Sequence, residues 1–120
     1  MVMLSLVCSL GVGDDKFIVG SLEQAQQLSE ETKKPLLLIF GAEYCIYCEK
    51  LKRAILARDL PETDPYIICY IDTEKQPEYK LKYGVSAIPD SRIIVGNKEK
   101  SKLIGFNSRQ YKGWAKTNDK

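Results

Sequence analysis

The sequence predicts an α/β domain in which helices cover both faces of a central mixed β-sheet. Leu36 to Phe40 form a short, uninterrupted apolar run, which is typical of a strand buried on both faces of a sheet. A helical pattern follows this run, and across the whole chain the expected elements alternate in the order βαβαβαββα. Alternation of this kind is typical of α/β and α+β domains with a layered core.

Length and composition are those of one globular domain without a nucleic-acid surface. The chain has 120 residues, of which 44% are hydrophobic and 28% charged, and its formal net charge is +2. This length is enough for one core, and no basic cluster is interleaved with aromatic residues. The sequence contains no histidine, which excludes histidine-dependent catalytic triads and metal sites built from imidazole.

The segment before the apolar run has the pattern of a short strand followed by a helix. Lys16 to Val19 is the predicted strand. Ser21 is placed as a helix N-cap, and Gln24, three residues later, completes a capping box. The helix is expected to run to about Lys33, with a buried stripe at Leu22, Ala25 and Leu28.

The second half of the chain predicts two more strand regions and two helices. Tyr66 to Ile71 is rich in β-branched and aromatic residues and predicts a core strand. Pro77 suits the first turn of a short helix, and Gly84 fits just past its end. The remaining segments predict a hairpin of Ile93–Val95 and Lys102–Ile104 around Gly96-Asn97, then a last helix from Arg109 to Lys116 capped by Ser108.

Two cysteines, Cys45 and Cys48, stand where the buried strand ends and a helix begins. Free backbone N–H groups and the positive end of the helix dipole stabilise a nearby thiolate, which is the nucleophile in disulfide exchange. Cys45 is therefore the expected attacking thiol. Cys48 is near enough to close a disulfide with it, and it belongs to the expected buried face of the helix with Leu51 and Ile55.

A zinc site and an inert structural disulfide are the alternatives to a redox pair. Without histidine, zinc would need Cys8, Cys69 or carboxylates as further ligands, and neither cysteine has a partner at metal-like spacing. Cys69 lies inside an apolar strand and is expected to be a small buried hydrophobe. The redox pair is the favoured interpretation, with the Cys45–Cys48 disulfide in place of any cofactor or metal.

The first 13 residues allow two interpretations. They could be an export leader, but they lack a basic residue before the apolar part and a small-residue cleavage site. The alternation of apolar and polar residues from Leu4 to Leu10 favours a strand. We expect residues 1–15 to be an N-terminal arm or extra strand and 16–120 to be the main domain, in a cytoplasmic protein that neither spans nor binds a membrane. Export would follow if the segment were a leader.

These residues resemble the thioredoxin-fold family. The matching features are the strand ending at Phe40, the C-x-x-C motif of Cys45 and Cys48 at the start of a helix, the strand ending at Asp72, and Ile88-Pro89 at the spacing typical of the family. The resemblance covers about residues 17–116. It implies that Pro89 follows a cis peptide bond beside the active-site cysteines and that the backbone at Ile88 pairs with a substrate strand.

The resemblance also implies an activity and a set of partners. The expected activity is thiol–disulfide oxidoreduction, in which disulfides of protein substrates are reduced and a thioredoxin reductase or glutathione restores the dithiol. Tyr44, Ile46 and Tyr47 are candidate substrate contacts, although the two tyrosines could equally be packing surface. We expect a monomer. An exported disulfide oxidant or isomerase, and a binding module that keeps the fold without catalysis, are the alternative functions.

The sequence departs from the family pattern around the cysteines. Ile39 and Ile68 stand where thioredoxins carry a buried aspartate and its lysine partner. Water or a carboxylate such as Glu43 would then have to take the proton when Cys48 attacks. Asp90 and Arg92 follow the proline, where a carboxylate would raise and a guanidinium would lower the pKa of a nearby thiol; the sequence leaves open which of them faces Cys45.

Overall fold

Five strands form one mixed sheet, as predicted. The computed structural model describes residues 17–118, and the strand order is β1-β3-β2-β4-β5. β1 and β2 run parallel to β3, β4 runs antiparallel to β2, and β5 runs antiparallel to β4. The strands are β1 (Phe17–Val19), β2 (Leu36–Gly41), β3 (Ile67–Asp72), β4 (Asp90–Val95) and β5 (Lys98–Ile104).

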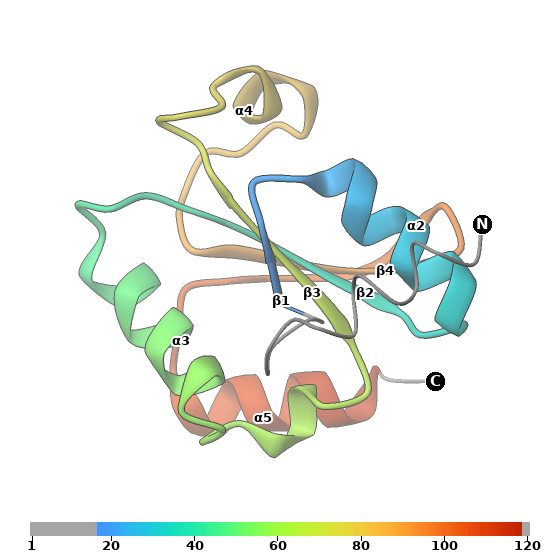
Figure 1. The fold of residues 1–120 in the computed structure, drawn as a ribbon. Helices are drawn as coiled ribbons and strands as arrows, with labels where there is room; N and C mark the ends of the chain where they lie inside the picture. Colours follow the sequence, from blue (N-terminus) through green and yellow to red (C-terminus); the bar gives the residue numbers. More distant parts are fainter. Residues whose placement is uncertain (1–16, 119–120) are drawn as a thin grey trace.

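Helices cover both faces of this sheet (Figure 1). α2 (Leu22–Thr32) and α4 (Glu78–Lys82) lie on one side, and α3 (Ile46–Leu56) and α5 (Ser108–Thr117) lie on the other. Alternate residues of β2 enter the two resulting cores, with Leu38 on the α2 side and Ile39 on the α3 side. Every residue of β2 is buried, which explains why the strand reads as a continuous apolar run.

The helix boundaries show where local sequence signals decide the structure. Ser21 caps α2 as predicted, and its side chain accepts a hydrogen bond from the Gln24 backbone N–H at 3.2 Å. The prediction that Ser108 caps the last helix was wrong. Asn107 has the extended backbone of an N-cap, and its Oδ1 accepts from the Gln110 N–H at 3.0 Å. Either residue type can cap a helix, so composition alone did not separate them.

The hairpin strands are longer than the sequence indicated. β4 begins directly after Pro89 and β5 directly after Asn97, whereas the apolar residues marked only the inner part of each strand. β5 is an edge strand with mostly exposed residues, so its lysines are compatible with strand structure. The predicted N-terminal arm, its extra strand and Cys8 lie outside the described residues. Within residues 17–118, no helix is both long and apolar enough to cross a membrane.

Replacing a central residue of β2 tests how much the layered core contributes to stability. Leu38→Ala removes a side chain with no exposed surface and is expected to lower the free energy of unfolding by about 2–5 kcal/mol, because a cavity remains between sheet and helices. Leu81→Ala is the control, since Leu81 is 87% exposed and should change stability by less than about 0.5 kcal/mol. Urea unfolding measures both. Equal losses would contradict the assigned core.

Candidate active site

The cysteine pair lies at the start of α3, directly after the loop that follows β2. Cys45 is the N-cap of this helix, and its Sγ accepts a hydrogen bond from the Cys48 backbone N–H at 3.1 Å. Cys45 and Cys48 form a disulfide, with their Cα atoms 5.2 Å apart. Cys45 is partly exposed, whereas Cys48 has no exposed surface. An incoming group can therefore reach the sulfur of Cys45 but not that of Cys48.

The predicted proline lies beside the strand that leads to the cysteines. The Ile88–Pro89 peptide bond is cis, as predicted. Asp90, the next residue, pairs with Phe40 in the antiparallel register of β2 and β4. Pro89 is therefore adjacent to the end of β2, where the chain leaves the sheet for Cys45. Its carbonyl oxygen accepts a hydrogen bond from the Gly105 N–H at 2.8 Å.

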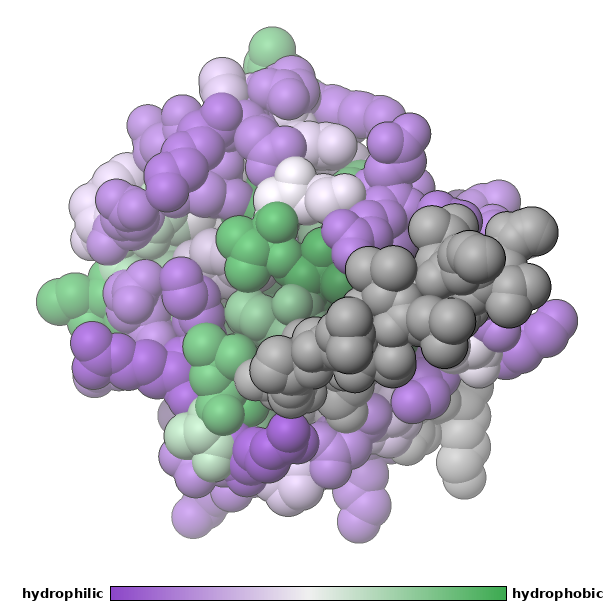
Figure 2. Space-filling view, in the orientation of Figure 1, coloured by the Kyte–Doolittle hydropathy of each residue, from purple (hydrophilic) through white to green (hydrophobic). Residues whose placement is uncertain are grey.

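The residues next to Cys45 in the sequence have exposed apolar side chains. Tyr44 is 71% exposed, Ile46 66% and Tyr47 56%, so these side chains are not part of the core. Figure 2 shows that the coloured part of the face in view is largely hydrophilic, with hydrophobic residues gathered near its centre and in small groups at its edge. Ile88, before the cis proline, is only partly exposed. Tyr44, Ile46 and Tyr47 thus offer apolar contact area next to the disulfide.

Behind the disulfide, the side chains of Tyr70 and Cys48 both reach Gly41. A Cβ placed on Gly41 would lie 2.8 Å from Tyr70 Cζ and 3.1 Å from Cys48 Sγ, and it would overlap the Tyr70 hydroxyl. Burial, with smaller contributions from Glu49, Asp72 and Glu43, raises the pKa of Tyr70 to about 12. Sequence reasoning placed Tyr70 only in a core strand. The signal that could have located it is the strand alternation, which directs Tyr70 and Ile68 to the same face as the cysteine helix.

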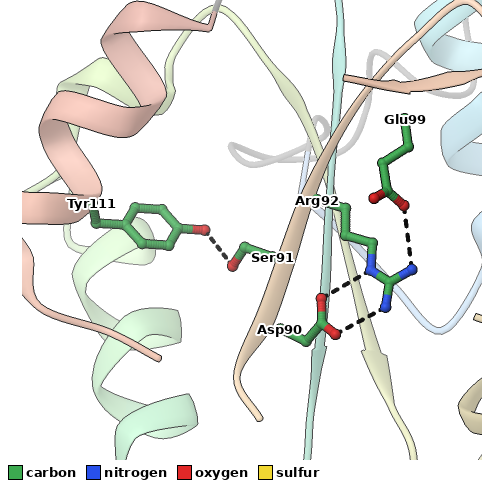
Figure 3. A network of polar contacts seen from close by, with 5 residues as sticks. All are labelled: Asp90, Ser91, Arg92, Glu99 and Tyr111. Atoms are coloured by element: carbon green, nitrogen blue, oxygen red, sulfur yellow. Dashed lines mark hydrogen bonds and ion pairs between the residues drawn. The ribbon is translucent and has the colours of Figure 1, made fainter. Parts of the chain in front are cut away.

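Asp90 and Arg92 pair with each other on the opposite face of the sheet. The Arg92 guanidinium donates two hydrogen bonds of 2.9 Å to the Asp90 carboxylate and one of 3.3 Å to Glu99 (Figure 3). It also lies over the rings of Phe40 and Tyr83. Hydrogen bonding to Asp90 raises the pKa of Arg92. The sequence left open which of these two charges faces Cys45. In the structure they neutralise each other, so neither is free to act on the cysteines.

Ser91, between these two residues, points to the other face of β4. Its Oγ accepts a hydrogen bond from the Tyr111 hydroxyl of α5 at 2.7 Å (Figure 3). Tyr111 has no exposed surface, and this burial raises its pKa well above the ordinary value of a tyrosine. The strand directly after the cis proline is thus held by polar contacts on both of its faces.

The other residues singled out in the sequence are buried in the core or paired with another side chain. Ile39 and Ile68 are buried core residues. Glu43 is exposed and forms an ion pair of 3.1 Å with Lys75. Cys69 is buried, as expected, and burial raises its pKa to about 12. Within residues 17–118 no group of three or more Cys, Asp or Glu side chains could hold a metal ion.

One cavity in the described part of the chain is at the other end of the sheet from the cysteines. It has a volume of about 500 Å³ and lies between the end of α2 and the turn that joins β4 to β5. A smaller pocket of about 100 Å³ lies near the cysteines, where Tyr70, Glu43 and Glu49 are among its lining residues. Neither pocket has a cysteine in its lining, and Cys45 itself is partly exposed.

Breaking the buried ion pair is expected to cost much of the stability of the domain. Asp90→Asn leaves the guanidinium of Arg92, 4% exposed, without its main partner, and should lower the free energy of unfolding by about 3–5 kcal/mol. Glu99→Gln is the control, because the Glu99 side chain is 43% exposed and should cost less than about 1 kcal/mol. Urea unfolding at pH 7 compares them. A loss for Asp90→Asn no larger than that of the control would refute this assignment.

Two buried tyrosines with raised pKa values, Tyr70 and Tyr111, predict a loss of stability in alkali. An unfolded tyrosine loses its proton near pH 10, whereas Tyr70 and Tyr111 keep theirs to higher pH when folded. The unfolded state then binds fewer protons, so the free energy of unfolding falls as the pH rises above about 10. Tyr70→Phe and Tyr111→Phe should each make this fall less steep in urea titrations between pH 8 and 11. Slopes parallel to that of the unmodified protein would contradict the expectation.

Comparisons with known proteins agree with this geometry. The profile of the thioredoxin-like family matches residues 18–89. A chloroplastic M-type thioredoxin of Zea mays is 27% identical over 101 residues, which are 82% of this chain and 59% of that protein. The chain therefore spans about three-fifths of the length of this curated relative.

Solved structures show the same fold. A thioredoxin h of poplar superposes with a TM-score of 0.76 at 15% identity, over 88% of this chain and 96% of the other. A thioredoxin of Fasciola hepatica superposes with a TM-score of 0.71 at 22% identity, over 86% and 99% of the two chains. Since the family profile covers more than half of the sequence, including both cysteines and Pro89, the chain belongs to the thioredoxin-like family.

Proposed function

We propose that the protein is a thiol–disulfide oxidoreductase that reduces disulfides of protein substrates through the dithiol form of Cys45 and Cys48. The observation that carries the proposal is the disulfide at the start of α3, which joins a partly exposed cysteine to a fully buried one. This asymmetry gives the two sulfurs different roles. The exposed sulfur meets the substrate, and the buried sulfur reacts only with its neighbour.

In the first step Cys45 attacks the substrate disulfide as a thiolate. The Cys48 N–H that donates to Cys45 Sγ in the disulfide form and the positive end of α3 stabilise this negative charge. A bond forms between Cys45 Sγ and one substrate sulfur while the substrate S–S bond breaks. The other substrate sulfur leaves as a thiolate and takes up a proton, so a mixed disulfide remains.

In the second step Cys48 attacks Cys45 Sγ and displaces the remaining substrate sulfur. The product is the Cys45–Cys48 disulfide seen in the structure, and two electrons have passed to the substrate. An external donor of the thioredoxin reductase or glutathione class then restores the dithiol. We propose that this cycle runs in the cytoplasm and that the protein acts as a monomer.

Substrate binding is proposed to follow the family pattern. An extended segment of the substrate would lie along the chain before cis-Pro89 and pair with the backbone at Ile88. Its apolar side chains would contact Tyr44, Ile46 and Tyr47, whose exposure leaves them available. Such a surface favours partly unfolded or extended segments around a disulfide, because backbone pairing and apolar contact depend little on sequence.

Trapping the intermediate tests the proposal directly. Cys48→Ser removes the second nucleophile, so incubation with a disulfide-containing protein should yield a stable mixed disulfide on Cys45, visible by mass spectrometry of the intact protein. Cys45→Ser is the matched control and should form no such adduct, because Cys48 is buried. Catalytic turnover should fall at least about a thousandfold in both variants. Unchanged turnover in the double variant would refute the oxidoreductase and favour a binding module.

A further inference from the structure

The hydroxyl of Tyr70 is buried without a hydrogen-bond partner. Tyr70 is 3% exposed, and within the described residues its Oη is a buried polar atom with no partner. Buried hydroxyl groups are nearly always hydrogen-bonded, because losing water without gaining a partner costs free energy. Among residues 17–118, the disulfide form therefore provides no acceptor for this donor.

This hydroxyl and the sulfur of Cys48 both approach Gly41. Both the Tyr70 hydroxyl and Cys48 Sγ occupy the space in which a side chain of Gly41 would have to begin. Tyr70 pairs with Ile39 in the register of β2 and β3, and Ile39 is fully buried and apolar. The sulfur of Cys48 is thus a polarisable atom that reaches the same end of β2 as the partnerless hydroxyl.

The chemistry of Cys48 creates a need for such a donor. In the proposed function, on which this inference rests, Cys48 must attack the mixed disulfide as a thiolate. Cys48 has no exposed surface, and a buried anion is strongly disfavoured unless hydrogen bonds stabilise it. Attack by the Cys48 thiolate is therefore slow unless a nearby group donates a hydrogen bond to its sulfur.

We propose that the Tyr70 hydroxyl donates a hydrogen bond to Cys48 Sγ once the disulfide is reduced, and that this bond stabilises the thiolate that resolves the mixed disulfide. Tyr70 gains its missing partner in the dithiol form, and Cys48 gains a fixed donor. Gly41 makes the contact possible, because any side chain there would separate the two groups.

The protonation state of Tyr70 suits this role. Burial raises its pKa to about 12, so the phenol remains protonated and stays a donor at neutral pH. It stabilises the thiolate without taking its proton. The charged groups that face the Tyr70 ring or line the small pocket beside it are Glu43, Glu49, Lys52, Asp72 and Lys75.

The atoms and electrons balance as in ordinary disulfide exchange. Cys48 gives its proton to solvent, and its thiolate forms a bond to Cys45 Sγ while the bond from Cys45 to the substrate sulfur breaks. The substrate sulfur leaves as a thiolate and takes a proton from solvent. Tyr70 is unchanged at the end of the step.

Single-turnover reaction with the aromatic disulfide 5,5′-dithiobis(2-nitrobenzoate) separates the two steps. Attack by Cys45 releases the first thionitrobenzoate, and attack by Cys48 releases the second, both visible by absorbance in stopped flow. A Cys8→Ser background leaves the buried Cys69 as the only other cysteine. We expect Tyr70→Phe to slow the second release about tenfold, to move the midpoint of its pH dependence up by about one unit, and to leave the first release unchanged.

Tyr66→Phe is the matched control. Tyr66 is also a buried tyrosine, but its hydroxyl donates to the Ala115 carbonyl at 2.6 Å. This variant should unfold at a lower temperature yet keep both release rates. Oxidised Tyr70→Phe should unfold at a temperature no lower than the unmodified protein, because it loses only an unpaired hydroxyl. Equal second-release rates in both variants, or an equal slowing of both steps in Tyr70→Phe, would overturn the inference.

A measurement on the unmodified side chain makes the test independent of any Tyr70 variant. In protein labelled with ¹³C at tyrosine Cζ, the Tyr70 resonance should shift on reduction and titrate with the midpoint of the second release, while that of Tyr66 should not. An unmoved Tyr70 resonance would overturn the inference. If the protein with Tyr70 in place shows no second release, the proposed function itself fails. A normal second release in Tyr70→Phe overturns only the role of Tyr70.

Discussion

Three segments converge at Gly41 so closely that no side chain fits there, and the rest of the site depends on this contact. β2 ends at this residue, the ring of Tyr70 reaches it from β3, and Cys48 Sγ reaches it from the first turn of α3. Because the helix is seated so tightly on the sheet, one sulfur is buried and the other is turned outward. The chemical difference between two identical side chains thus arises from packing.

The two faces of the sheet divide the polar groups between them. On the α3 side, Ile39 and Ile68 are buried apolar residues, and Tyr70 supplies a buried neutral hydroxyl. On the α2 side, Arg92 is neutralised by Asp90 and stacked over aromatic rings. A buried ion pair is tolerated where each charge has a partner with good geometry. The chain therefore has isoleucines where thioredoxins carry a buried aspartate and lysine. The strand after the cis proline is still held by polar contacts, because Asp90 and Arg92 pair on the other face of the sheet.

Much of the fold could be predicted from the sequence because its signals are local. The apolar run of β2, the capping serine of α2 and the spacing of Cys48, Leu51 and Ile55 each report a burial pattern that the structure shares. The pairing of Asp90 with Arg92 and the approach of Tyr70 and Cys48 to Gly41 could not be predicted in this way. The pairing depends on β4 beginning at Asp90, which the apolar residues of the strand did not mark, and the approach depends on the depth at which α3 packs on the sheet. Tyr70 was hidden because an aromatic residue in a buried strand is ordinarily a core residue.

The reduction potential of the Cys45–Cys48 pair decides whether the two sulfurs act together as one redox couple. Protein equilibrated in defined thiol–disulfide buffers would be alkylated, and its free thiols would be counted by mass. The account predicts that both cysteines titrate together as one two-electron couple, with a potential nearer to about −270 mV, as in reductants, than to about −120 mV, as in disulfide donors. Two cysteines that fail to titrate together would contradict the account, and a single couple near the higher value would reverse the proposed direction of electron flow.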